Sequence, residues 1–188
     1  MKRIARILGM FTAGAALLCL ALAGCGNQSV PTSGIQTDTA FSVTADDFLT
    51  QFISLTMREP IFVSDADSTV NAGGKIKSYQ FGDTLQDGIS YQLSLDYRPE
   101  DGILTGVTLS TQLLQNADGA GYAENSFFGL YAREAIRALE ADADLSAINE
   151  NCNLSGTEDS DTTYQTAALS IRTVIADGAA TVEITALP

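Results

Sequence analysis

Apolar residues recur along this chain with two different periods, and each period predicts a different kind of element. In residues 89–97 every second residue is apolar or aromatic and the residues between are Ser, Gln and Asp, which predicts a strand with one buried face and one wet face. Residues 103–113 repeat the alternation, and the connection 98–102 holds Pro and Asp-Gly. We therefore expect an antiparallel hairpin in the middle of the chain.

Two stretches have helical spacing instead. Thr44 can cap a helix that carries acids in its first turn, and Pro60 predicts that this helix ends near Arg58. Residues 122–141 have an apolar face with Arg and Glu opposite to it, which predicts a second main helix.

The other stretches give weaker signals. Residues 64–74 are expected to form a polar loop before a strand at 75–81, and residues 142–162 an acidic, irregular segment with one helical turn near Leu145. Two strands, 163–175 and 179–187, are expected to close the chain through the tight turn Ala176-Asp177-Gly178.

The predicted order is therefore α-β-β-β-α-β-β. Connections of hairpin length require antiparallel neighbours, so we expect an α+β two-layer sandwich with an antiparallel sheet of about five strands and two main helices. This element order is similar to that of the secretion-chaperone-like fold, and loosely to cystatin-like domains. Such a similarity concerns architecture and implies no function.

The N-terminus has the anatomy of an export signal. Basic residues at positions 2, 3 and 6 precede an apolar run over residues 7–22, which ends in Leu22-Ala23-Gly24-Cys25. These four residues resemble the lipobox of bacterial lipoproteins. The resemblance implies a diacylglycerol on the Cys25 sulfur, cleavage between Gly24 and Cys25, and acylation of the new amino group. An uncleaved membrane anchor is the alternative, but a run of about 16 apolar residues is short for a bilayer.

The chain then divides into three parts. Residues 1–24 are the expected lipoprotein signal peptide, residues 25–40 the lipidated cysteine with a flexible linker, and residues 41–188 a single α+β domain of ordinary size. We expect an extracytoplasmic protein that is anchored to a bacterial membrane by lipid at Cys25.

Charge and composition remove several function classes. The chain has 10 Lys+Arg and 23 Asp+Glu, and loss of residues 1–24 takes three basic and no acidic residues, so the formal charge changes from −13 to −16. This balance argues against nucleic acid as a partner and against adsorption on anionic lipid. The absence of His excludes Ser-His-Asp catalysis and His-ligated metals.

The cysteines leave no internal disulfide to expect. Cys19 departs with the signal, Cys25 is lipidated and only Cys152 remains. Cys152 lies beside acidic and amide residues, which disfavours a thiolate, so we interpret it as a structural thiol.

Acidic loops are the main candidates for chemistry, because carboxylates bind Ca²⁺. The run that starts at Asp65 and Asp67 begins like an EF-hand loop, but Val70 and Ile76 occupy two decisive positions. Two further groups are acidic enough for a weak site: Asp142 and Asp144, and Glu158, Asp159 and Asp161. Solvated loops are the favoured explanation of these groups, and we assign no catalytic residue, metal ligand or cofactor.

Two functions remain open. The first is a lipid-anchored binding or assembly module of the cell envelope that recognises an envelope protein or peptide, with Tyr122, Phe127 and Tyr131 as candidate exposed aromatics. Core packing is the alternative role of these three residues. The second function is a small carboxylate-dependent or Ca-dependent envelope hydrolase that uses the acids of residues 142–161.

Overall fold

Seven strands pair side by side, all antiparallel, in the computed structural model, which describes residues 39–82, 89–154 and 156–188. The strands are β1 (Ile61–Asp67), β2 (Lys75–Gly82), β3 (Ser90–Tyr97), β4 (Leu104–Gln112), β5 (Ser160–Gln165), β6 (Leu169–Ala176) and β7 (Ala179–Ala186). The helices are α2 (Ala45–Thr56), α3 (Ser126–Leu139) and α4 (Leu145–Cys152). The strand order in the sheet is β1-β2-β3-β4-β7-β6-β5, so β1 and β5 are its edges.

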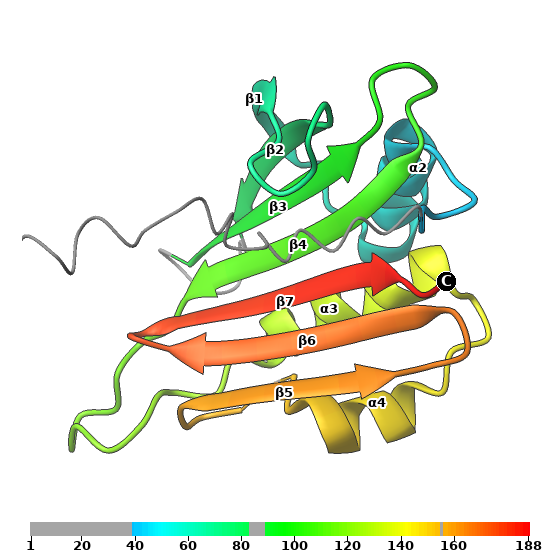
Figure 1. Cartoon of the computed structure of the whole chain (residues 1–188). Coiled ribbons are helices and arrows are strands. Elements are labelled where there is room, and N and C mark those ends of the chain that lie inside the picture. The colour runs from blue at the N-terminus through cyan, green and yellow to red at the C-terminus, as the bar shows by residue number, and fades with distance from the viewer. Residues whose placement is uncertain (1–38, 83–88, 155) are drawn as a thin grey trace, which may run out of the picture. The chain divides into compact units, whose positions relative to one another are not determined.

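The three helices lie on one face of the sheet, behind it in the view of Figure 1. Helix α2 contacts α3 and β3, while α4 contacts β5 and β6. The opposite face, which we call the open face, carries the alternate residues of every strand. Side chains of the central strands therefore alternate between the buried core and the open face, as period-two strands require.

An aromatic cluster fixes α2 and α3 to the sheet. Phe52 of α2 packs edge-on against Phe81 of β2 with ring centroids 5.9 Å apart, and Phe81 stacks on Tyr91 of β3 at 5.3 Å. Tyr131 of α3 meets both Phe81 and Tyr91 edge-to-face, at 5.1 and 4.9 Å. Offset and edge-to-face pairs add to the free energy gained by burial, so this cluster is the centre of the core.

Two local predictions are confirmed: the Thr44 cap of the first helix and the tight turn at Ala176-Asp177-Gly178. The Thr44 side chain accepts a hydrogen bond from the Asp47 amide and caps α2. Asp177 and Gly178 both have positive φ, 52° and 75°, as a two-residue hairpin turn between β6 and β7 requires.

The prediction of about five strands and two main helices is wrong. The observed order over the described residues is α-β-β-β-β-α-α-β-β-β, with one sheet of seven strands and three helices. The similarity to the secretion-chaperone-like fold rested on the predicted order and does not apply to the observed one.

Three segments account for the difference. The expected loop 64–74 begins inside β1, whose seven residues are all exposed and therefore show no apolar alternation. The expected strand 163–175 is two strands, because the Thr166 hydroxyl accepts hydrogen bonds from the amides of Ala168 and Leu169 and closes a turn between β5 and β6. The expected irregular segment contains α4, which is capped by Asp144.

Candidate functional site

The acids of β1 are engaged with neighbouring strands. Asp67 forms an ion pair with Lys75 at 2.9 Å, and this contact lowers the pKa of Asp67 from its ordinary value. Asp65 accepts hydrogen bonds from the Tyr97 hydroxyl at 3.0 and 3.2 Å. These two carboxylates lie on a strand and are engaged there, so they do not open a calcium-binding loop.

The second acidic stretch is likewise used for structure. Asp144 accepts from the amides of Ser146 and Ala147, each at 3.1 Å, and so caps α4. Asp159 accepts from the Tyr122 hydroxyl at 3.0 Å, and Asp161 pairs with Arg172 at 2.8 Å. Across the described parts of the chain, no group of three or more His, Cys, Asp or Glu side chains is placed to hold a metal ion.

The aromatic residues considered as an exposed surface belong mostly to the core. Tyr131 is 1% exposed. Phe127 packs beside it at 6.4 Å, partly buried against the core. Tyr122 is partly buried as well, and its hydroxyl accepts a hydrogen bond from the Gly178 amide at 3.0 Å. The core-packing alternative therefore describes these side chains.

Cys152 is fully buried in the core at the end of α4. Burial raises the pKa of its thiol to about 11. A thiol that stays protonated in this way is a poor nucleophile.

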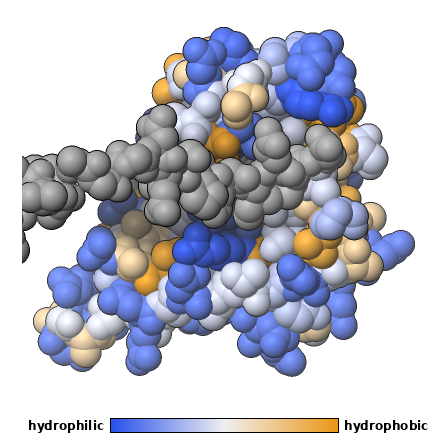
Figure 2. Space-filling model, viewed as in Figure 1, coloured by the Kyte–Doolittle hydropathy of each residue, from blue (hydrophilic) through white to orange (hydrophobic). Residues whose placement is uncertain are grey.

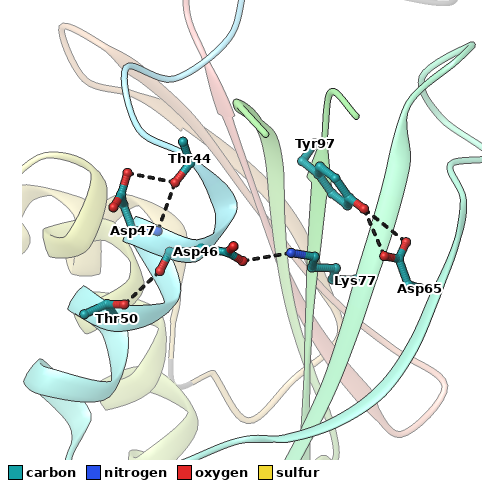
Figure 3. A network of polar contacts seen from close by, with 7 residues as sticks. All are labelled: Thr44, Asp46, Asp47, Thr50, Asp65, Lys77 and Tyr97. Carbon is teal, nitrogen blue, oxygen red and sulfur yellow. Dashed lines mark hydrogen bonds and ion pairs between the residues drawn. The ribbon is translucent and has the colours of Figure 1, made fainter. Parts of the chain in front are cut away.

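A polar network links the start of α2 to the first three strands, as Figure 3 shows. Lys77 donates to Asp46 at 2.8 Å and lies 5.0 Å from the centre of the Tyr97 ring, whose hydroxyl donates to Asp65. The hydrogen bond to Asp46 raises the pKa of Lys77. A lysine held in its charged form serves as a cross-link between helix and sheet and is unsuited to act as a base or nucleophile.

One carboxyl group is buried on the open face. Asp96 of β3 is 7% exposed and accepts a hydrogen bond of 2.5 Å from the hydroxyl of Ser68, in the β1–β2 loop. It lies opposite Gly106 of β4. The Asp96 side chain packs over this glycine, because a Cβ added at position 106 would lie 3.5 Å from the Cβ of Asp96. Desolvation raises the pKa of Asp96, and the hydrogen bond from Ser68 opposes this shift.

Replacement of Asp96 by Asn is expected to stabilise the fold at neutral pH. A raised pKa in the folded state favours the protonated form, so the stabilisation by that proton is complete below the ordinary value of 3.8 and is lost as the pH rises through the folded-state pKa. The carboxamide of the variant stays neutral at every pH. The advantage of Asp96→Asn should therefore be largest at neutral pH and shrink as the pH falls toward 3.8.

Urea unfolding of the two proteins over this pH range measures the effect. Glu100→Gln, in the exposed β3–β4 turn, removes the same charge and controls for the change in net charge. A variant Asp96→Asn that is less stable than the parent at neutral pH would contradict the expectation.

Four exposed apolar residues lie between the end of α2 and the middle of β1. Met57 is 85% exposed, Ile61 72%, and Phe62 and Val63 56% each. Phe62 rests edge-on against Tyr79 at 5.8 Å, and the register of β1 against β2 shifts between Phe62 and Ser64. We call Met57, Ile61, Phe62 and Val63 the β1 edge patch.

A groove of about 550 Å³ crosses one end of the open face. Its walls come from β1, β2, β3, β4 and β7. The lining residues are Val63, Gln80, Ser90, Gln92, Ser110, Thr111, Gln112, Ala179 and Thr181. None of these nine residues is ionisable, in a chain with 23 acids. We call this feature the neutral groove. On this side of the molecule, Figure 2 shows mainly hydrophilic and intermediate residues, drawn in blue and white.

Neither the patch nor the groove was predicted from the sequence. The sequence feature that could have indicated the patch is the apolar run Ile-Phe-Val directly after Pro60. An edge strand at this place has no alternation of apolar and polar residues, so the run did not predict a strand. Among the groove residues, Ser90 and Gln92 were predicted to lie on the wet face of the strand 89–97.

Comparison with known proteins identifies no relative of this chain. No protein-family model, curated protein or solved structure matches the chain.

Within the described residues, no helix has the length and apolar character needed to cross a membrane.

Proposed function

We propose that this chain is a lipid-anchored binding module of the bacterial cell envelope, and that it holds an extended segment of a partner envelope protein along the free edge of β1. The observation that carries this proposal is the β1 edge patch. Exposed apolar residues are common singly, but three consecutive ones on an edge strand, Ile61, Phe62 and Val63, offer apolar contact and unpaired strand edge together. Addition of a partner strand uses both.

The two halves of β1 differ in the charge of their side chains along the free edge of the sheet. The second half carries Asp65 and Asp67, and charged side chains of this kind discourage unselective strand pairing. The first half, from Ile61 to Val63, has no charged residue. An edge that is protected over half of its length is suited to a specific partner strand rather than to general aggregation.

Charge indicates the chemistry of that partner. The domain carries a large acidic excess, and five of its cations are paired internally: Lys75, Lys77, Arg98, Arg137 and Arg172. The field around the domain therefore attracts a basic segment. A strand antiparallel to β1 would place basic residues beside Asp65 and Asp67, followed by apolar residues beside Ile61.

The expected lipid anchor places this surface where such a partner is met. Two or three acyl chains hold a domain firmly on a membrane, and a linker of about 15 residues leaves it free to approach neighbouring proteins. The hydrolase alternative has no assembled group of carboxylates in the described residues to support it.

In-cell photo-crosslinking tests the proposal with the full chain in its native membrane. A photo-reactive amino acid at Ile61 should give one defined adduct, and mass spectrometry should map it to an extended, apolar and basic segment of another envelope protein. The second substitution Met57→Asp should reduce the adduct at least about fivefold, because a charge then enters the apolar contact.

Leu114→Asp is the matched control. Leu114 is also exposed, at 62%, but lies after β4, outside the patch. This variant should leave the adduct unchanged. An adduct that survives Met57→Asp, or that contains only a second copy of this chain, would overturn the proposal.

A further inference from the structure

We propose that the neutral groove is a second binding site, for an uncharged glycan chain whose hydroxyl or acetamido groups form hydrogen bonds with the groove. The site adjoins the β1 edge patch: Val63 belongs to both, and Ile61 lies opposite the groove residue Gln80 in the sheet. The polar side chains that carry the inference lie on β2, β3, β4 and β7, away from the free edge of β1. The inference therefore stands without the proposed function, and its test leaves Ile61 and Val63 unchanged.

Strand register builds the floor of the groove. Gln80 lies opposite Gln92, Gln92 opposite Ser110, and Ser110 opposite Thr181. Four strands thus contribute one straight row of polar side chains. Neighbouring strands lie about 4.8 Å apart, so the row is about 14 Å long, which is enough for a short oligosaccharide.

The row consists of groups that both donate and accept hydrogen bonds. Carboxamides and hydroxyls have this property, and so do the hydroxyl and acetamido groups of a neutral sugar. The Gln80 side chain already donates to the Ser90 hydroxyl at 2.6 Å, which holds one wall in place before a ligand binds. A polar surface that is arranged in advance loses less conformational entropy on binding.

The β-bulge of β1 supplies an apolar wall. The register shift between Phe62 and Ser64 adds Val63 to the strand as an extra residue, and Val63 lines the groove. Bulges commonly redirect a side chain next to a binding site. Ala179 provides a second apolar position on the β7 side, so the groove can contact the apolar C–H faces of a sugar ring.

Among the described residues that line the groove, the absence of charge indicates the ligand class. An anionic ligand would be repelled by the acidic domain, and a cationic one would find no carboxylate among the nine lining residues. A peptide is less suited, because the backbone groups of β3, β4 and β7 are paired in the sheet and offer it no strand edge. A neutral glycan needs only side-chain hydrogen bonds.

Calorimetric titration of the full, lipidated chain tests the inference, in a detergent without a sugar headgroup. The probes are the neutral hexasaccharides of N-acetylglucosamine and of glucose, with oligogalacturonate as the anionic comparison. We expect binding of at least one neutral probe with a dissociation constant of roughly 1 mM or below and none of the anionic one.

Gln92→Glu and Gln165→Glu form a matched pair. Both are exposed glutamines on strands of the same sheet and both changes add one negative charge, but Gln165 lies on β5, at the opposite edge from β1. Gln92→Glu should weaken binding about tenfold or more, and Gln165→Glu less than about twofold. Unchanged thermal unfolding shows that both variants are folded.

Three results would overturn the inference. They are the absence of heat with every neutral oligosaccharide at millimolar concentration, equal effects of the two substitutions, and equally tight, Gln92-dependent binding of a neutral Gly-Ser peptide. The last result would assign the groove to a peptide instead.

Discussion

Phe52→Ala is expected to lower the free energy of unfolding by about 3–5 kcal/mol. The Phe52 side chain is 0% exposed. Its ring lies 6.0 Å from that of Phe48 and 5.9 Å from that of Phe81, so it joins α2 to the sheet. Truncation removes buried apolar area and leaves a cavity between two layers that are held apart by neighbouring aromatics. A loss of this size is a large part of the stability of an ordinary domain.

Urea unfolding followed by circular dichroism measures the loss, and Phe62→Ala is the matched control. The same chemical change at Phe62 removes a ring that is 56% exposed and contacts Tyr79, so it should cost about 1 kcal/mol or less. If Phe62→Ala were as destabilising as Phe52→Ala, the core would not be centred on the α2–sheet contact.

The elements that the sequence predicted well are those that bury one face. In β3, Tyr91, Leu93 and Leu95 are all 0% exposed, and their polar neighbours lie on the open face. Because one face of such a strand is buried, apolar and polar residues alternate along its sequence, and this alternation predicts the strand. The same reasoning holds for α2 and α3, whose apolar stripes cover the sheet.

The elements that were missed are those whose positions are decided by pairing rather than by burial. Strand β1 needs only one neighbour and exposes all seven residues, so its sequence carries no core-facing alternation. The division between β5 and β6 depends on a hydroxyl of Thr166 that bonds to two amides, within a segment that reads as continuous strand. Such local hydrogen bonds compete with strand pairing and are not visible in hydrophobic periodicity.

The neutral groove could not be predicted from hydrophobic periodicity either. Gln92 and Ser110 were predicted to face water on one hairpin, and the structure places them side by side. Thr181 joins them only because β7 pairs with β4, although residues 113–178 separate the two strands in the sequence. A non-local pairing of this kind follows from the topology, which the predicted element order did not contain.

Cys25→Ser is expected to abolish lipid attachment. The resemblance to the lipobox implies that the Cys25 sulfur receives the diacylglycerol and that cleavage then occurs before this residue. A serine has no thiol, so the precursor should keep residues 1–24 and incorporate no labelled palmitate. Gel mobility, intact mass and palmitate labelling of the membrane fraction measure this, and Cys19→Ser, inside the apolar run, should behave like the parent.

The strength of the anchor follows from the same chemistry. Each buried methylene contributes about 0.8 kcal/mol, and a single acyl chain gives only marginal, reversible binding with an association constant of about 10⁴ M⁻¹. The formal charge expected after processing is −16 and would repel anionic headgroups, so we expect the acyl chains to supply the attachment. Palmitate label and cleavage that persist in Cys25→Ser would contradict the lipoprotein assignment.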